Sequence, residues 1–96
     1  MSPKNRIKLK KVRKKLDKLD DQFLHLIKIR TKLVDKVIKL KEFKSEIVDV
    51  KRVKKILFNI KKKSLNKKID SNITNKIWKN MIFAYINYQK KNFKKK

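Results

Sequence analysis

An apolar repeat runs through the first forty residues of this chain and limits the folds open to it. Apolar side chains recur at spacings of three and four: Leu9, Val12, Leu16, Leu19, Phe23, Leu26, Leu33, Val37 and Leu40. One further position of the same repeat is filled by Arg30. This spacing predicts one apolar side of a long helix, which we call the seam, and Ser2 and Pro3 provide a helix-start signal. We expect a helix over roughly residues 4–42, about 58 Å long.

A helix of this length cannot cover its own seam. It needs packing partners along its length, either two shorter helices or a second chain. The chain has 96 residues, no Gly and 40% apolar residues. The missing Gly disfavours tight turns and β-rich folds, and so small a core predicts association with another copy.

Two shorter helices are predicted after a connection at residues 43–48. Asp49 is a good N-cap for the first, whose apolar stripe is Val50, Val53, Leu57 and Ile60, with Ile56 beside it. The polar run at residues 61–68 ends that helix. Asp70 or Ser71 caps the other, which reaches Gln89. Its stripe is Ile73, Ile77, Trp78, Met81, Ile82 and Tyr85. Trp78 and the other aromatic residues have helical spacing, so we expect them in the core.

The sequence thus predicts an all-α chain of three helices with a long first helix. We expect a single domain over residues 1–96, with a core at about 9–92 and a frayed basic tail at 93–96.

The charge is extreme, with 32 Lys and Arg against 8 Asp and Glu, a formal net charge of +24. Such a charge is typical of proteins that bind nucleic acid or a membrane surface. The interpretation we favour is a compositional bias without a function, because the chain is rich in Lys, Ile and Asn throughout. Because the lysines are spread over every segment, we expect nucleic-acid binding to be non-specific at most.

Nothing in the sequence indicates a membrane span, a signal peptide or a disulfide, since apolar runs are short and Cys is absent. We therefore expect a cytoplasmic protein. The chain also shows no metal motif, phosphate loop or nucleophile–base pair, so we expect no metal and no cofactor.

Arginine is scarce enough to be informative. The chain has only four, Arg6, Arg13, Arg30 and Arg52, among 28 lysines. A guanidinium binds a carboxylate or phosphate through two parallel hydrogen bonds, which an ammonium cannot do. A buried guanidinium needs an anion, so Arg30 in the seam predicts either an ion pair with an acidic residue or a bound carboxylate or phosphate.

Other polar residues have ordinary and functional interpretations. Lys41 follows Arg30 by 11 residues, which places both on one face of a helix, yet a solvated lysine is the usual case. Arg13 lies about 25 Å from Arg30 along the helix and on another face, so only a second copy brings both to one ligand. Gln89 continues an apolar stripe, and an amide that faces a core needs a hydrogen-bond partner, which is either the protein, the commoner case, or a ligand. Asp49 has a sufficient ordinary role as a helix cap, and Arg52 has one as a surface residue in the first turn.

Two segments resemble the all-helical chorismate mutase family. Residues 12–20, VRKKLDKLD, are similar to its opening "(L/I)R..(I/L)D.LD", and residues 49–52, DVKR, resemble the start of its second helix. Arg30 and Lys41 match the arginine and lysine that lie between these segments in the family.

The third helix extends the resemblance over roughly residues 9–92. Residues 77–82, IWKNMI, followed by Gln89, are similar to the family's third helix and its terminal glutamine. The ordered set of Arg, Arg, Lys, Asp, Arg and Gln carries the resemblance, because no single motif is specific.

The resemblance implies an intertwined helical homodimer whose active sites each borrow an arginine from the other subunit. Arg13 of the partner and Arg30 would bind the two carboxylates of chorismate. Lys41 and Gln89 would bond to the ether oxygen of the breaking bond. The remaining substrate-binding residues implied are Asp49, Arg52 and Tyr85.

One departure leaves the substrate open. Family mutases often carry Glu after the second-helix arginine, where this chain has Val53. Val53 after Arg52, with Tyr85 and Ile86 before Gln89, is closer to the related isochorismate pyruvate lyases. We favour the mutase, with the lyase as the alternative. Two other hypotheses remain. The chain is a non-enzymatic basic protein that binds nucleic acid, or it is a family member without activity.

Overall fold

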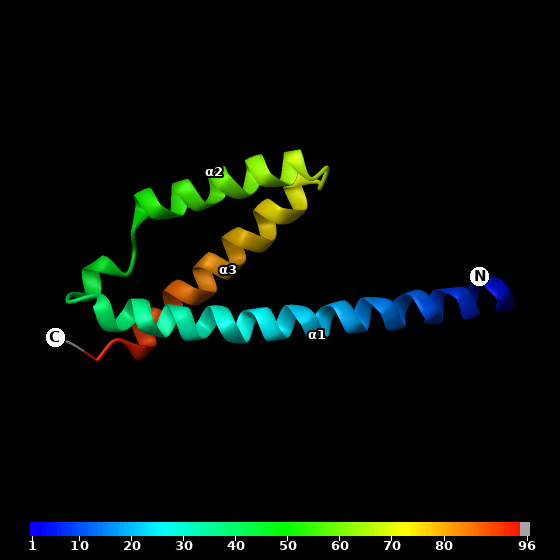
Figure 1. The fold of residues 1–96 in the computed structure, drawn as a ribbon, viewed down its shortest axis with the longest axis horizontal. Coiled ribbons are helices and arrows are strands. Elements are labelled where there is room, and N and C mark those ends of the chain that lie inside the picture. Colours follow the sequence, from blue (N-terminus) through cyan, green and yellow to red (C-terminus); the bar gives the residue numbers. More distant parts are fainter. Residues whose placement is uncertain (95–96) are drawn as a thin grey trace. The chain divides into compact units, whose positions relative to one another are not determined.

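The computed structural model describes residues 1–94, which form three α-helices and one short 3₁₀-helix (Figure 1). In chain order these are α1 (Pro3–Leu40), η1 (Lys44–Glu46), α2 (Val50–Asn66) and α3 (Ser71–Asn92). The predicted all-helical chain with a long first helix is confirmed. Lys95 and Lys96 of the predicted tail lie outside the described residues.

The chain divides into two units, Met1–Leu33 and a second that begins at Val34. Within residues 1–94, none of the helices has both the length and the apolar character needed to cross a bilayer.

Helix α1 begins as predicted and ends two residues early. The Ser2 hydroxyl accepts from the Asn5 backbone N–H at 3.2 Å, which makes Ser2 the cap. The helix ends at Leu40, although the Lys41 N–H still bonds to the Val37 carbonyl at 3.2 Å. The backbone becomes extended at Phe43, and this change of direction accompanies the burial of Ile47, which is only 3% exposed.

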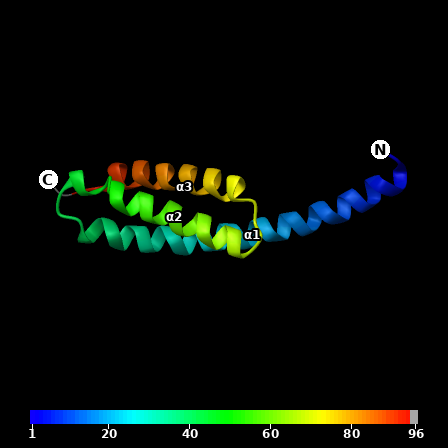
Figure 2. The same cartoon turned by 90° about the horizontal axis from the view of Figure 1, so that it is seen from above.

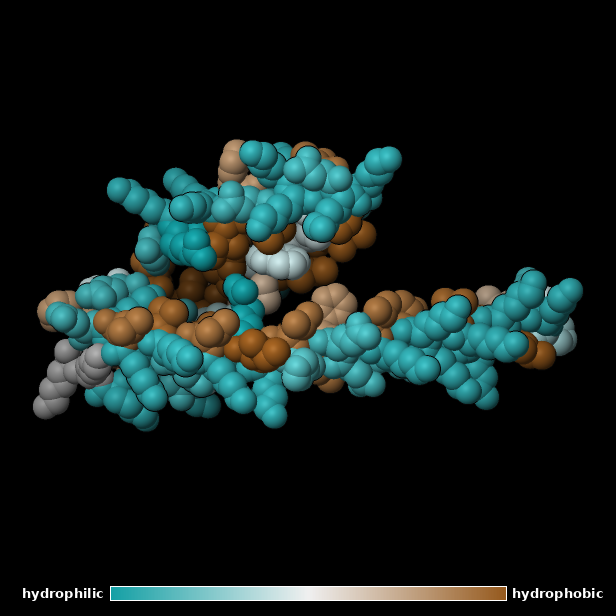
Figure 3. Space-filling view, in the orientation of Figure 1, coloured by the Kyte–Doolittle hydropathy of each residue, from teal (hydrophilic) through white to brown (hydrophobic). Residues whose placement is uncertain are grey.

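In the first unit the seam remains largely exposed. Leu16, Phe23 and Leu33 keep 53%, 60% and 55% of their surface open. In Figure 3, hydrophobic residues (brown) follow one edge of α1 beside hydrophilic ones (teal). Among residues 1–94, the buried apolar side chains are only Ile38 and Ile47, both in the second unit. The core within one chain is therefore very small.

In the second unit both predicted helix caps are present. The Asp49 carboxylate accepts from the Arg52 N–H at 3.0 Å and so caps α2. The Asp70 carboxylate accepts from the Asn72 N–H at 2.9 Å, which decides between Asp70 and Ser71 as the cap of α3. Helix α3 runs past Gln89 to Asn92.

Helices α2 and α3 pack side by side (Figures 1 and 2). Ser64, 3% exposed, joins them: its hydroxyl lies 2.6 Å from the Ile60 carbonyl and 2.7 Å from the Thr74 hydroxyl. One polar group is thus buried where α2 meets α3, and its hydrogen-bonding capacity is used.

The turn between α2 and α3 has a conformation that usually needs glycine. The Ile69 N–H bonds to the Ser64 carbonyl and the Lys68 N–H bonds to the Leu65 carbonyl, the pattern of a Schellman motif. Lys68 has a φ of 57°. In a chain without Gly, a lysine accepts this left-handed conformation and its steric cost.

The expectation that the aromatic residues lie in the core is wrong for most phenylalanines. Trp78 and both tyrosines are half-buried. Four phenylalanines are exposed: Phe23, Phe43, Phe58 and Phe83. Helical spacing identifies a shared face but does not say whether the chain itself covers that face.

Replacing Lys68 by Gly should stabilise the protein by about 0.5–1 kcal/mol, because the left-handed conformation costs glycine nothing. Urea unfolding at neutral pH measures the change. Lys67→Gly is the matched control: it removes the same charge at φ −91°, where glycine has no advantage, and should not stabilise. Equal stabilisation by both variants would point to charge relief rather than backbone strain.

Candidate active site

Two predicted site residues meet in the second unit. Lys41, just after α1, donates from Nζ to Oε1 of Gln89 on α3 at 3.1 Å. The same ammonium lies 3.5 Å from the Ile47 carbonyl, a weaker contact. Both Lys41 and Gln89 are half-buried. Lys41 is therefore held in place by the protein and is not an ordinary solvated lysine.

A second hydrogen bond, between α3 and α1 itself, lies nearby. The Tyr88 hydroxyl on α3 donates to Oδ1 of Asp35 on α1 at 2.6 Å. Tyr88 and Gln89 are consecutive, so the last turns of α3 bond to α1 at Asp35 and to Lys41 just beyond it. These two bonds fix how α3 lies against the end of α1, and with it the position of the Gln89 amide.

This bond changes the titration of Tyr88. The hydrogen bond to Asp35 raises the pKa of Tyr88 above its ordinary value of 10.0, because the neutral phenol is the donor. Burial and the charge of Asp35 act in the same direction. Tyr85, which was predicted to bind substrate, lies edge-to-face with Tyr88, with ring centroids 6.3 Å apart. Tyr85 therefore packs beside the Asp35–Tyr88 hydrogen bond.

The start of α2 carries the other predicted residues of this unit. The Asp49 carboxylate is engaged as the helix cap, and Arg52 is exposed in the first turn. Val53, where the resemblance would place Glu, is half-buried. The ordinary roles predicted for Asp49 and Arg52 are thus present.

Arg13 and Arg30 both belong to the first unit. Arg30 is half-buried although Leu26 and Leu33 on either side of it in the seam are exposed. Arg13 is exposed and borders a shallow hollow together with Asp17. Seventeen residues of continuous helix separate the two arginines by about 25 Å. Within one α1, they cannot bind the same small ligand.

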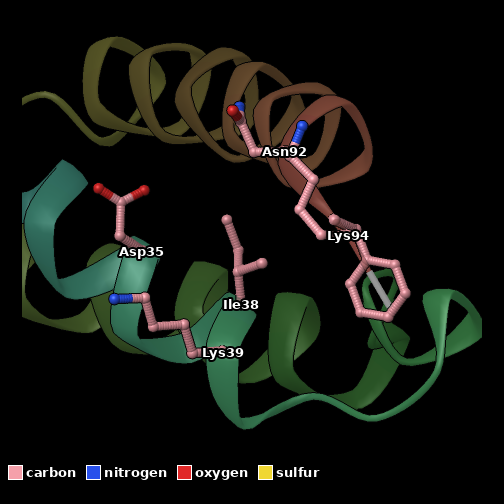
Figure 4. A pocket seen from close by; sticks show the side chains of 6 residues that line it. Asp35, Ile38, Lys39, Asn92 and Lys94 are labelled. Carbon is pink, nitrogen blue, oxygen red and sulfur yellow. The ribbon is translucent and has the colours of Figure 1, made fainter. Parts of the chain in front are cut away.

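A hollow of about 270 Å³ opens beside Asp35 (Figure 4). It is lined by Asp35, Ile38, Lys39, Asn92, Phe93 and Lys94. Figure 4 shows Ile38 and Asn92 on opposite sides of this space, on α1 and α3. Lys41 and Gln89 are not among these six lining residues, and none of the six was predicted for the site.

Asp35 and Tyr88 were missed by the sequence analysis. A signal for Asp35 was present, because it is the only acid between residues 22 and 41 in a chain with few acids. Its partner is 53 positions away, and neither spacing nor composition reveals such a contact.

The paired ammonium and amide provide an electropositive, hydrogen-bonding point at the junction of α1 and α3. A lysine ammonium has three N–H donors, and within residues 1–94 two acceptors lie within 3.5 Å of it. The remaining donor, with the Gln89 amide N–H₂ group, suits an oxygen that is negatively charged or becomes so.

Residues 12–90 match the family model for Chorismate mutase type II. The chain belongs to this family. The match covers most of the chain and confirms the family resemblance. The domain is of an isomerase type and is all-helical, as expected. No curated protein and no solved structure matches the chain.

Removing the Tyr88 hydroxyl should destabilise the protein at neutral pH but much less at high pH. The pKa of Tyr88 is raised in the fold, so its stabilisation is complete below pH 10 and is lost as pH rises through the folded-state value. Urea unfolding of the native protein and Tyr88→Phe, at neutral pH and at about pH 11, measures this difference.

Asp35→Asn provides the control for the charge. It keeps an acceptor near Tyr88 and should return the tyrosine titration, followed by ultraviolet absorbance, toward 10. A native Tyr88 that titrates at or below 10 would contradict the hydrogen bond.

Proposed function

We propose that this protein converts chorismate to prephenate at a site built around Lys41 and Gln89. The observation that carries the proposal is the 3.1 Å hydrogen bond between these side chains in a chain of the chorismate mutase type II family. The family resemblance implies that the residues at these two positions contact the ether oxygen of the substrate.

The reaction is a pericyclic rearrangement, so it requires no nucleophile and no proton transfer. Its rate depends on holding the substrate in the reactive conformer and on placing fixed charge where charge develops. As the C–O bond breaks, negative charge grows on the ether oxygen. The ammonium of Lys41 and the amide N–H₂ of Gln89 would stabilise that oxygen most in the transition state.

The substrate carboxylates would be bound by arginines. Arg30 provides a two-pronged guanidinium from the half-buried position in the seam. Arg13 is too far along the same helix to reach that ligand, so the second carboxylate would be bound by Arg13 of another copy. Asp49, Arg52 and Tyr85 would complete the binding of the ring and its hydroxyl group.

The second copy in this proposal is supported by the exposed seam. More than half of the surface of Leu16, Phe23 and Leu33 is open in one chain, and an apolar stripe of this length is rarely left in water. A homodimer in which two α1 helices pair would cover it and complete two identical sites.

Val53 supports isochorismate pyruvate lyase activity as the second candidate. Its half-buried apolar side chain offers no hydrogen bond to a ring hydroxyl, in contrast to the Glu at this position in many mutases. A related pericyclic elimination of pyruvate would use the same Lys41 and Gln89 contacts.

The test is product formation from chorismate, followed by NMR, for the native protein and for Lys41→Met. The native protein should form prephenate. Lys41→Met has nearly the same length but no charge, and should lower kcat by about 10²–10³-fold with a smaller change in KM. Gln89→Leu should lower kcat in the same way.

Lys39→Met is the matched control, since Lys39 is an exposed lysine two residues away and outside the proposed site. It should leave kcat within about twofold of the native value. Pyruvate and salicylate formed from isochorismate, with chorismate unchanged, would replace the mutase by the lyase. Turnover of neither substrate would refute both proposals.

A further inference from the structure

Phe58 is an exposed aromatic residue whose helical neighbours are all lysines. The residues three and four positions away on either side are Lys54, Lys55, Lys61 and Lys62. On a helix these positions surround the central residue, with Cβ atoms about 5–6 Å apart. Phe58 is 68% exposed and all four lysines are exposed, so the ring and the ammonium groups face solvent together.

This arrangement is specific to Phe58. The most similar exposed residue, Phe83 at 65%, has Lys79, Asn80, Ile86 and Asn87 at the corresponding positions. Phe23 has Leu19, Asp20, Leu26 and Ile27 there, which belong to the seam and its border. The general abundance of lysine therefore does not surround every exposed phenylalanine with charge.

Helix α2 itself carries only one sign of charge. Helix α2 contains seven basic residues and no Asp or Glu. Hydrophilic side chains project from the outer side of α2 in Figure 3. A hollow of about 300 Å³ lies beside the ring, lined by Leu57, Phe58, Lys61, Ser71, Asn72 and Asn75. These six lining residues include hydroxyl and amide groups but no carboxylate.

We propose that the surface formed by Phe58, the four lysines and the adjoining hollow binds single-stranded nucleic acid. A base would stack on the exposed Phe58 ring, the flanking ammonium groups would bind the phosphates on either side, and Asn72 and Asn75 would lie beside the base edge. Stacking on an aromatic ring within a basic groove is how sequence-tolerant single-strand binding is achieved. This function is independent of the proposed isomerase site.

Charge complementarity favours this occupant over a second copy of the chain. Two such faces would bring lysines against lysines, with no acid on α2 to pair with them. A polyanion without bases would satisfy the lysines but would leave the exposed ring without a partner. Bases supply the flat π surface that the ring can contact.

The experiment compares binding of a fluorescently labelled oligothymidylate and of inorganic polyphosphate to the full chain. Phe58→Ala should weaken oligothymidylate binding about tenfold and leave polyphosphate binding within about twofold. Phe58→Leu, which keeps an apolar side chain but has no π face, should behave like Phe58→Ala, whereas Phe58→Trp should bind at least as well as the native protein. Phe83→Ala is the matched control and should change neither affinity.

Salt dependence separates the roles of the ring and the lysines. Lys62→Ala should reduce the slope of log affinity against log salt by about 0.7, while Phe58→Ala should leave the slope unchanged. Circular dichroism checks that each variant keeps the native helix content.

Three results would overturn the proposal. The first is unchanged oligothymidylate binding by Phe58→Ala and Phe58→Leu. The second is an equal loss of oligothymidylate and polyphosphate binding, which would reduce the surface to non-specific charge. The third is Phe58-dependent binding to phosphatidylserine vesicles without Phe58-dependent binding to the oligonucleotide, which would make the face a membrane contact.

Discussion

The apolar seam of α1 needs a partner to cover it, and this need shapes the whole molecule. Its side chains recur every three or four residues, yet Leu16, Phe23 and Leu33 each remain more than half exposed in one chain. Burying such side chains is worth about 1.5–3 kcal/mol each, so a partner that covers the seam gains much of the stability that this small core lacks. The partner we propose is a second copy, despite the mutual repulsion of two chains of charge +24.

The second unit shows how a few polar contacts position a charged group, the ammonium of Lys41. Asp35–Tyr88 and Lys41–Gln89 are hydrogen bonds between α3 and the end of α1, and Ser64–Thr74 is the corresponding bond between α2 and α3. Each joins residues that are far apart in the sequence or lie on different helices. The proposed catalysis requires a fixed charge and not a mobile one, so the contact with Gln89 would serve both the fold and the proposed chemistry.

Local signals in the sequence predicted the helices well. Caps at Ser2, Asp49 and Asp70 have strong intrinsic preferences, and the seam has a regular period, so both are readable without tertiary information. The position of Lys41 beside Gln89 followed only from family resemblance. The Asp35–Tyr88 bond and the exposure of Phe58 were not predicted, because they depend on which faces meet across long sequence separations. The left-handed conformation of Lys68 could not be predicted, because the chain has no glycine to mark such a position.

The most direct test of a site shared between two copies is subunit exchange between Arg13→Ala and Arg30→Ala. Each variant alone should be inactive, because every site lacks one arginine. After exchange, half of the dimers are mixed and each holds one intact site, so the mixture should recover about a quarter of the native activity. No recovery, with mixed dimers verified by native mass spectrometry, would contradict a site completed by Arg13 of the second copy.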